Sequence, residues 1–339
     1  MVHLRQRIAD RLVYTAARIG AAGAGMVQPE TALRWAAGLG HQLYRFDRRH
    51  RERALSNLAG AYPELSHAQR ERIAVDSFSH FFRLAVELFS TPRLLSRHNF
   101  ADRIKLRGLD EALDLFNSKR ALVLVTGHYG NWEVLGSLLA LLGYHIEAVA
   151  RPIDNRLINQ WLLEVRQRRG LRIISKWEQE LDRMTALLSA GGMLGLVADQ
   201  NAGGRGLFVP FFGRLASTHK SLALLAVSRQ VPVICGYARR RGLGCHFELG
   251  VSDIIHPEHW QSQPDPIYYV TARFMHAIEQ MVRQQPEQYL WMHRRWKTRP
   301  RHERQGKPMP AALRRKLESL PWMDQPTLDR LINPPIEWA

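Results

Sequence analysis

The stretch Ala121-Leu-Val-Leu-Val-Thr-Gly-His-Tyr-Gly-Asn-Trp-Glu133 predicts a strand, a turn and the start of a helix. Its first five residues form an apolar run that is typical of a buried strand, and the small residues Thr126 and Gly127 end that run. We expect the helix that follows to extend to about Leu142. In open α/β folds, residues that directly follow a strand lie at the carboxyl edge of the sheet, where functional sites gather. His128 therefore occupies a position that is typical of a reactive side chain.

His128 and Glu133 are candidates for a general base and the carboxylate that orients it. On one continuous helix, a spacing of five residues would leave the two side chains roughly 140° apart, because each residue turns by about 100°. They can meet only if His128 precedes the helix and Glu133 lies in its first turn, a geometry that Gly127 and Gly130 favour. A carboxylate placed there could polarise the imidazole. The alternative is a structural histidine that caps the helix beside an exposed glutamate.

Strand and helix patterns alternate from Ile104 onward, which favours a largely parallel sheet covered by helices on both faces. Residues 231–239 and 244–251 are typical of an antiparallel pair, so we expect a mixed sheet. The predicted fold class is α/β, with a mixed, largely parallel central sheet flanked by helices and an N-terminal helical region. The expected strands lie near 121–125, 145–150, 172–174 and 193–197, and the expected helices include Glu178 to Ala190 and Asp265 to Gln285.

The first 60 residues are predicted to be helical. Arginines among apolar residues in 4–19 suit a helix that lies on a membrane surface; the alternative is a helix packed on the domain with a solvated basic face. The apolar run from Leu12 to Val27 contains Arg18 and is shorter than the ~20 residues that span a bilayer. We therefore expect an interfacial or buried helix there.

A further amphipathic helix is expected from Ser66, its N-cap, to Phe89. Its predicted apolar side consists of Phe78, Phe81, Phe82, Val86 and Phe89. With these boundaries we expect an N-terminal helical, membrane-associating region in residues 1–100, an α/β core in 101–300 and a Pro-rich C-terminal extension in 301–339 that is flexible or lightly docked.

The chain carries a formal net charge of +17, which favours anionic partners such as nucleic acid, anionic lipid headgroups or an acidic carrier protein. Residues 291–316 hold ten Lys and Arg against one acidic residue, with Trp291 and Trp296 between them. A non-catalytic basic module that binds nucleic acid or membrane would use this segment. No known nucleic-acid motif is present, however, and the tryptophans suit an interface equally well, so we expect no nucleic-acid partner.

The sequence resembles a known family in five blocks. Gly127-His-Tyr-Gly-Asn-Trp-Glu133 resembles the His-x4-Asp/Glu block of the lysophospholipid acyltransferase superfamily, in the form that its bacterial lipid A lauroyl/myristoyl acyltransferase branch carries. The resemblance covers about residues 40–300. The other four blocks follow in order: Ala150-Arg-Pro-Ile-Asp-Asn155, Ala198-Asp-Gln200, Val209-Pro-Phe-Phe-Gly213 and Gln288-Tyr-Leu-Trp-Met-His-Arg-Arg-Trp-Lys-Thr-Arg-Pro300.

The resemblance implies an O-acyltransferase that moves a fatty acyl chain from an acyl thioester, on acyl carrier protein or CoA, to a hydroxyl. The implied acceptor is a lipid A precursor or another anionic glycolipid or lysophospholipid. His128 would be the base, Glu133 its partner, and the backbone amides around Gly130 and Asn131 would stabilise the oxyanion. No serine lies in a Gly-x-Ser-x-Gly elbow, so direct attack by the acceptor is expected, with no metal and no cofactor.

Four further residues are candidates for substrate binding. Arg151 ends the strand after the catalytic helix and could bind a phosphate by bidentate hydrogen bonds. Asp199 could order an acceptor hydroxyl or pair with a nearby arginine, and we favour the second. Arg294 and Arg295 could hold an anionic acceptor or simply face water or lipid. The segment 209–213 could be a core hairpin or a wall of an acyl pocket, and both can hold at once.

The cellular setting follows from the same features. Cys235 and Cys245 fit no zinc spacing and no disulfide framework, which favours a reducing compartment and core positions for both thiols. The resemblance implies a location at the cytoplasmic face of the bacterial inner membrane, where we expect a peripheral protein or one weakly anchored by its N-terminal helix.

Overall fold

A computed structural model describes residues 2–95, 98, 100–175, 180–242 and 244–334. In these residues the main sheet has seven strands in the order β1-β9-β8-β2-β5-β3-β4. All neighbouring strands are parallel except β8 and β9, which confirms the predicted mixed sheet. The strands are β1 (Ile104–Arg107), β2 (Leu122–Thr126), β3 (Ile146–Ala150), β4 (Arg172–Ser175), β5 (Met193–Val197), β8 (Val233–Arg240) and β9 (Phe247–Ile255).

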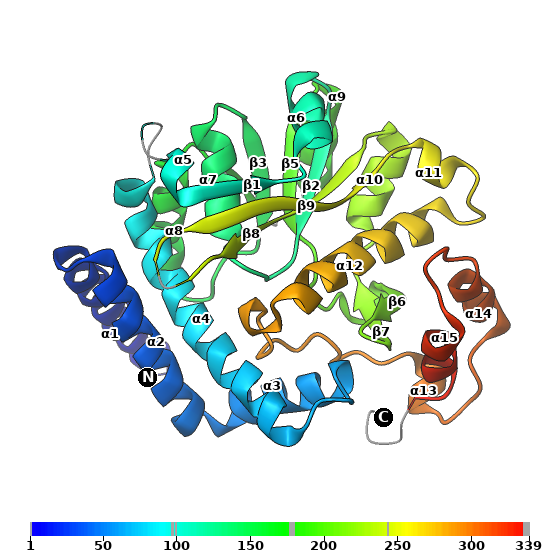
Figure 1. Ribbon diagram of the computed structural model, residues 1–339, viewed down its shortest axis with the longest axis horizontal. Helices are drawn as coiled ribbons and strands as arrows, with labels where there is room; N and C mark the ends of the chain where they lie inside the picture. The colour runs from blue at the N-terminus through cyan, green and yellow to red at the C-terminus, as the bar shows by residue number, and fades with distance from the viewer. Residues whose placement is uncertain (1, 96–97, 99, 176–179, 243, 335–339) are drawn as a thin grey trace.

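Helices cover both faces of the sheet, because alternate residues of each strand point to opposite sides. Val123 and Val125 of β2 belong to a core cluster that includes Phe274 of α12, whereas Leu122 belongs to the cluster of Phe116 on α6. In Figure 1 α12 runs alongside β9, and it contacts both β8 and β9. The elements that follow the strands are α6 (Asp110–Asn117), α7 (Trp132–Leu141), α8 (Arg156–Gln167), α9 (Glu180–Ser189), η1 (Gly203–Arg205), α10 (Ser221–Arg229), α11 (Glu258–Gln261), α12 (Pro266–Gln284) and η2 (Pro286–Gln288).

The expected strands and helices of this core are present within a few residues of their predicted bounds. The helix after the 121–125 strand ends at Leu141, and the late helix begins after its N-cap Asp265. The predicted start of α9 at Glu178 lies outside the described residues. Cys235 and Cys245 are both buried and both free.

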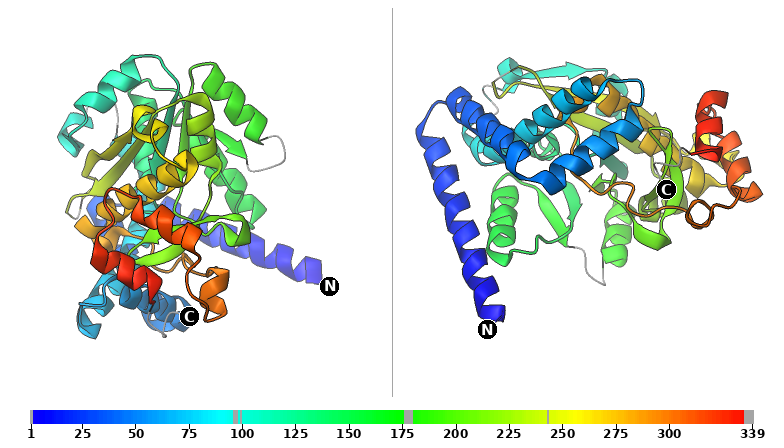
Figure 2. Two further views of the ribbon diagram at one scale, coloured as in Figure 1. Left: turned by 90° about the vertical axis from the view of Figure 1, so that its right-hand side faces the viewer. Right: turned by 90° about the horizontal axis from the view of Figure 1, so that it is seen from below.

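The N-terminal region is helical, as predicted. It contains α1 (Val2–Met26), α2 (Pro29–Phe46), α3 (Arg48–Ala61), α4 (His67–Leu94) and α5 (Phe100–Arg103). Ser66 caps α4 in a reciprocal pair with Gln69. The backbone amide of Gln69 donates to Ser66 Oγ over 3.3 Å, and the backbone amide of Ser66 donates to Gln69 Oε1 over 2.8 Å. Figure 2 shows α1 projecting from the body of the molecule. Within the described residues, no helix is both long and apolar enough to cross a bilayer.

The predicted apolar side of α4 is only partly buried. Phe78 is fully buried in the main core, but Phe81 is 40% exposed. Phe89 stacks on Trp161 of α8 with ring centroids 4.0 Å apart.

The segment 209–213 forms a core hairpin. Strands β6 (Leu207–Phe211) and β7 (Arg214–Thr218) pair antiparallel in a second, two-stranded sheet. Val209, Phe211 and Phe212 are fully buried in the main core. None of residues 209–213 lines either of the two cavities described below. The geometry therefore favours a core hairpin over a wall of an acyl pocket.

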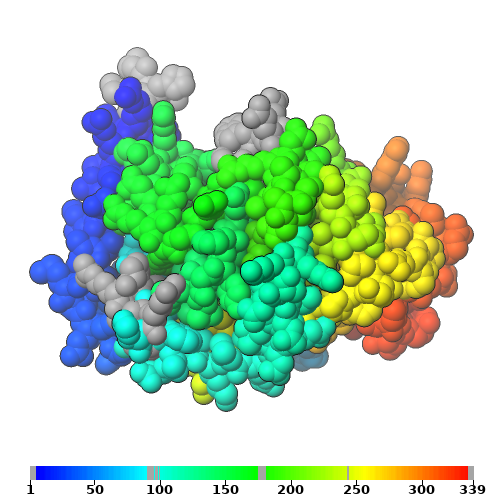
Figure 3. Space-filling view, turned by 90° about the horizontal axis from the view of Figure 1, so that it is seen from above, coloured from blue at the N-terminus to red at the C-terminus, as the bar shows by residue number. Residues whose placement is uncertain are grey.

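The C-terminal segment docks on the core. Its helices are α13 (Arg301–Arg304), α14 (Ala311–Glu318) and α15 (Gln325–Ile332). Leu317, Leu328 and Leu331 are buried in the main core cluster, and α15 contacts β7. The N-terminal helices and this segment lie at opposite ends of the molecule (Figure 3).

Candidate active site

The loop between β2 and α7 is held on both sides by backbone hydrogen bonds. Asn131 caps α7 by accepting from the amide of Val134 over 3.0 Å. The amide of Gly130 donates to the carbonyl of Gln288 over 3.0 Å, and that of Asn131 donates to the carbonyl of Ala238 over 2.6 Å. The expected role of these two amides at an oxyanion is therefore wrong, because protein carbonyls already occupy both donors.

Gly130 is required at its position in this loop. It has a φ of +58°, and a Cβ built there would lie 2.2 Å from the carbonyl oxygen of Ala238. Only glycine satisfies both constraints without strain. The tight turn places His128 directly after β2, at the carboxyl edge of the sheet, as predicted.

Asp199, not Glu133, orients the imidazole of His128. His128 Nδ1 lies 2.6 Å from Asp199 Oδ1, and the His128 amide donates to Asp199 Oδ2 over 2.9 Å. Asp199 is fully buried. Burial raises its pKa, but the charge and hydrogen bonds of His128 outweigh burial and hold that pKa well below its usual range. An ionised acceptor at Nδ1 fixes the proton there, so that Nε2 carries the lone pair of a base. The expected pairing of Asp199 with an arginine is wrong.

Glu133 pairs with Arg166 of α8. Arg166 Nη2 lies 2.5 Å from Glu133 Oε1, and Arg166 Nε lies 3.1 Å from Oε2, a bidentate pair. Glu133 does lie in the first turn of α7, as predicted. Its carboxylate reaches across to α8, however, while the Nδ1 of His128 is already engaged by Asp199.

His128, Glu133, Arg151 and Arg166 line one cavity of about 230 Å³. Arg151 is exposed at this site. Gln200 also lines the cavity, and its side-chain nitrogen lies 3.4 Å from His128 Nε2. The structure therefore brings together four of the predicted site residues, His128, Glu133, Arg151 and, behind His128, Asp199, and adds Arg166 and Gln200.

Two aromatic side chains pack against the His128 ring. Trp132 meets it edge-on with ring centroids 5.0 Å apart, and His293 stacks on it at 5.9 Å. Burial is the main cause that lowers the pKa of His293 to about 4, so this second imidazole is neutral at pH 7. The ring of His128 is thus confined on two sides.

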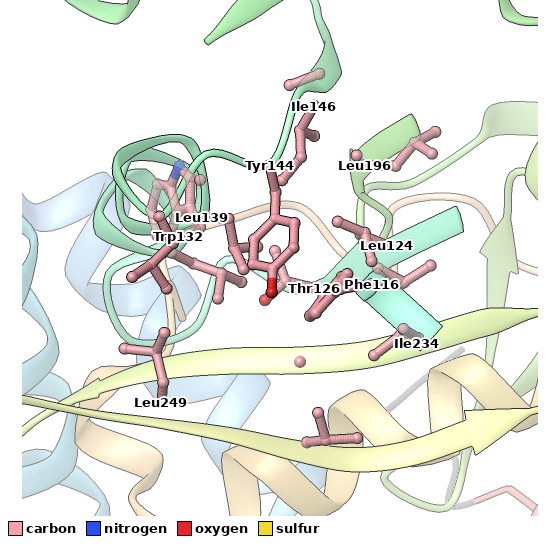
Figure 4. A pocket seen from close by; sticks show the side chains of 18 of the residues that line it. Phe116, Leu124, Thr126, Trp132, Leu139, Tyr144, Ile146, Leu196, Ile234 and Leu249 are labelled. Atoms are coloured by element: carbon pink, nitrogen blue, oxygen red, sulfur yellow. The ribbon is translucent and has the colours of Figure 1, made fainter. Parts of the chain in front are cut away.

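A second, apolar cavity of about 140 Å³ adjoins the first. It lies between the sheet and helices α6 and α7, and Figure 4 shows Leu124, Ile234 and Tyr144 among the side chains that surround it. The two cavities share six lining residues: Trp132, Gly136, Ala148, Val149, Leu171 and Val197. The apolar cavity is therefore a direct neighbour of the cavity that His128 lines.

The predicted residues of the 291–296 segment are mostly structural. Arg295 is 1% exposed, and its guanidinium donates to Ser217 O over 2.6 Å and to Thr218 Oγ1 over 2.5 Å. The expectation that Arg295 binds an acceptor does not fit this geometry. Trp291 and Trp296 are buried in the main core, so they are not interface residues, whereas Arg294 is exposed.

Sequence reasoning gave no role to Arg166, Gln200 or His293. Gln200 and His293 lie inside blocks that resemble the family, which was a usable signal. Arg166 lies in an ordinary amphipathic helix and had none. Among the described residues, no group of three or more His, Cys, Asp and Glu side chains is placed to hold a metal ion.

Comparison with known proteins extends the resemblance toward the N-terminus. The profile of a family described as bacterial lipid A biosynthesis acyltransferase matches residues 10–298. The chain is 26% identical to the lipid A biosynthesis lauroyltransferase of Escherichia coli (strain K12) over 273 residues, which cover 79% of this chain and 85% of that protein. It is 26% identical to the palmitoleoyltransferase of the same strain over 261 residues, 75% and 81% of the two chains. It is 24% identical to lipid A biosynthesis acyltransferase 2 of Shigella flexneri over 287 residues, 83% and 88% of the two chains.

Proposed function

Because the chain belongs to the bacterial lipid A biosynthesis acyltransferase family, we propose that it moves a fatty acyl chain from an acyl thioester to a hydroxyl of a lipid A precursor, with His128 as general base. The observation that supports this most is the position of His128. It is oriented by a buried carboxylate and lines a cavity that shares six lining residues with an apolar one.

The geometry supports direct transfer. Nε2 of His128 accepts the proton of the acceptor hydroxyl while the hydroxyl oxygen attacks the thioester carbonyl carbon. The tetrahedral intermediate then collapses, the C–S bond breaks, and the departing thiolate takes the proton back from the imidazolium. Asp199 stabilises that imidazolium by its charge.

The substrates fit the charges and shape of the site. The apolar cavity beside Trp132 suits the acyl chain, and Arg151 suits a phosphate of an anionic glycolipid. An acidic acyl carrier protein suits a chain of net charge +17 as donor. Acyl-CoA with another glycolipid or a lysophospholipid acceptor is the alternative within the same chemistry.

Two exposed apolar stripes support a peripheral position at the cytoplasmic face of the inner membrane. On α2, Trp35, Leu39 and Phe46 are 58%, 60% and 82% exposed. Their spacing places them within about 40° of one another around the helix. Ile8, Leu12, Ile19 and Met26 form a similar stripe on α1. Replacing Trp35 and Phe46 by serine should reduce flotation with phosphatidylglycerol-containing vesicles, whereas Leu181→Ser, an exposed leucine on α9, should not.

The hypothesis of a non-catalytic nucleic-acid-binding module loses its main support, because Trp291 and Trp296 are buried and cannot stack on bases.

The proposed acyl transfer is tested with radiolabelled acyl carrier protein thioester or acyl-CoA as donor, and a lipid A precursor or a lysophospholipid as acceptor. We expect labelled lipid A product with the wild type, its loss with His128→Ala, and normal turnover with His145→Ala, an exposed histidine. Full activity of His128→Ala would contradict the proposed base.

A further inference from the structure

The Glu133–Arg166 pair is built into the cavity of His128. The two side chains form a bidentate contact, and both line the cavity wall. Glu133 occupies Nε and Nη2 of the guanidinium and leaves Nη1, which has no hydrogen-bond acceptor among the described residues. Because a guanidinium group is planar, a carboxylate that holds Nε and Nη2 also fixes the direction in which Nη1 points.

Positive charge exceeds negative charge around this pair. Arg151 lines the same cavity and has no ion pair within the described part of the chain. Arg169 interacts electrostatically with Glu133 and Arg166. Counting Asp199 beside His128, three guanidinium groups accompany two carboxylates, which leaves an excess of one positive charge. Such an excess beside a general base suits an anionic group of a substrate rather than a neutral sugar.

We propose that Arg166 and Arg151 together bind a phosphate group of a substrate, and that Glu133 is a positioning residue that presents Arg166 to it. This proposal rests on the proposed function. Both guanidinium groups can donate to phosphate oxygens, and Glu133 fixes the plane of one of them before the substrate arrives, which lowers the entropy lost on binding.

The proposal separates the roles of the two carboxylates in the site. Asp199 contacts His128 and acts on proton transfer. Glu133 contacts Arg166 and acts on binding. A change at Asp199 should therefore lower kcat and change the pH profile, whereas a change at Glu133 should raise a KM and leave the pH profile of kcat in place.

The phosphate has two possible sources, the glycolipid acceptor and the phosphopantetheine arm of the donor. The test measures kcat and both KM values for Arg166→Gln, Glu133→Gln, Arg166→Glu and the exchanged pair Glu133→Arg/Arg166→Glu. Arg183→Gln, which removes a more exposed ion-pair partner of Glu147, is the control. A rise in the KM of the acceptor that disappears when the acceptor is dephosphorylated identifies the acceptor; a rise in the KM of the donor identifies the donor.

We expect Arg166→Gln to raise one KM by about 10- to 100-fold, with kcat within about threefold of the wild type. Arg166→Glu alone should raise the KM further, and the exchanged pair should reverse a large part of that rise. Positions 133 and 166 both line the cavity, so the exchanged pair keeps one guanidinium there. The proposal is overturned if both KM values stay unchanged in Arg166→Gln, if the exchanged pair is no better than Arg166→Glu, or if Glu133→Gln changes the pH profile of kcat as Asp199→Asn does.

A binding measurement tests the phosphate site without any catalytic turnover. Isothermal titration with phosphorylated and dephosphorylated lipid A precursor in detergent micelles, and with the free phosphopantetheine arm, should show a phosphate-dependent affinity that Arg166→Gln removes. If the wild type transfers no acyl chain but binds in this way, the proposed function fails and the phosphate site stands. If it transfers acyl chains and no phosphate dependence is found, the phosphate site fails alone.

Discussion

Replacing Asp199 by asparagine preserves the shape of the side chain and removes the charge that orients His128. The carboxylate accepts two hydrogen bonds from His128, at 2.6 Å from Nδ1 and 2.9 Å from the backbone amide. An asparagine offers one acceptor oxygen, so one of these bonds is lost in either orientation of its amide. If its NH2 group faces Nδ1, the imidazole proton moves to Nε2, and the ring can no longer accept a proton from the acceptor hydroxyl.

We expect Asp199→Asn to lower kcat about 10³-fold or more, which corresponds to about 4 kcal/mol of transition-state stabilisation. The assay is steady-state acyl transfer to a lipid A precursor at saturating donor. Asp253→Asn is the matched control, because Asp253 also accepts a bidentate pair, at 2.8 and 2.9 Å from Arg273, but lies away from the cavity. A kcat of Asp199→Asn within tenfold of the wild type, in a folded protein, would refute the assignment of Asp199 as the orienting group.

Three further predictions concern the structure around the site. Gly130→Ala should destabilise the fold by more than about 3 kcal/mol in urea unfolding, because the new Cβ would meet the carbonyl of Ala238, whereas Gly203→Ala, also at positive φ but in open space, should cost only about 1–2 kcal/mol; equal effects would contradict this. Glu87→Gln should cost about 3–5 kcal/mol, because Glu87 and Arg240 form a fully buried pair at 2.6 Å, and Glu318→Gln on an exposed pair should cost less than about 1 kcal/mol. Because burial lowers the pKa of His293 to about 4, the unfolded chain binds a proton there first, so the free energy of unfolding should fall by up to about 3 kcal/mol between about pH 6.5 and 4. His293→Gln should lack this component, and an unchanged pH dependence would show that His293 does not cause it.

The local features of the site were predictable from the sequence, since they depend on neighbouring residues. The apolar run before Thr126 and the glycines after it determine the strand and the turn, and they place His128 at the carboxyl edge of the sheet. The strand bounds agree closely because each buried strand is a short apolar run between turn residues.

The partners of the carboxylates were not predictable, because they depend on distances in space. Asp199 is 71 residues from His128, and Arg166 is 33 residues from Glu133. Five-residue spacing suggested a local pair instead. Basic neighbours likewise suggested that Trp291 and Trp296 belong to an interface. Arg295 is instead buried and Arg299 partly buried, both donate to backbone carbonyl groups, and the two indoles lie in the core.

The central claim is direct acyl transfer from a thioester to a hydroxyl with His128 as base. The most direct measurement is a rapid-quench single turnover that follows the intact masses of both the protein and the lipid A precursor. We expect the precursor to gain one acyl chain at a rate that His128→Ala abolishes, while the protein never gains that mass. An acylated protein that forms and decays at the rate of turnover, or product formation by His128→Ala at the wild-type rate, would contradict the claim.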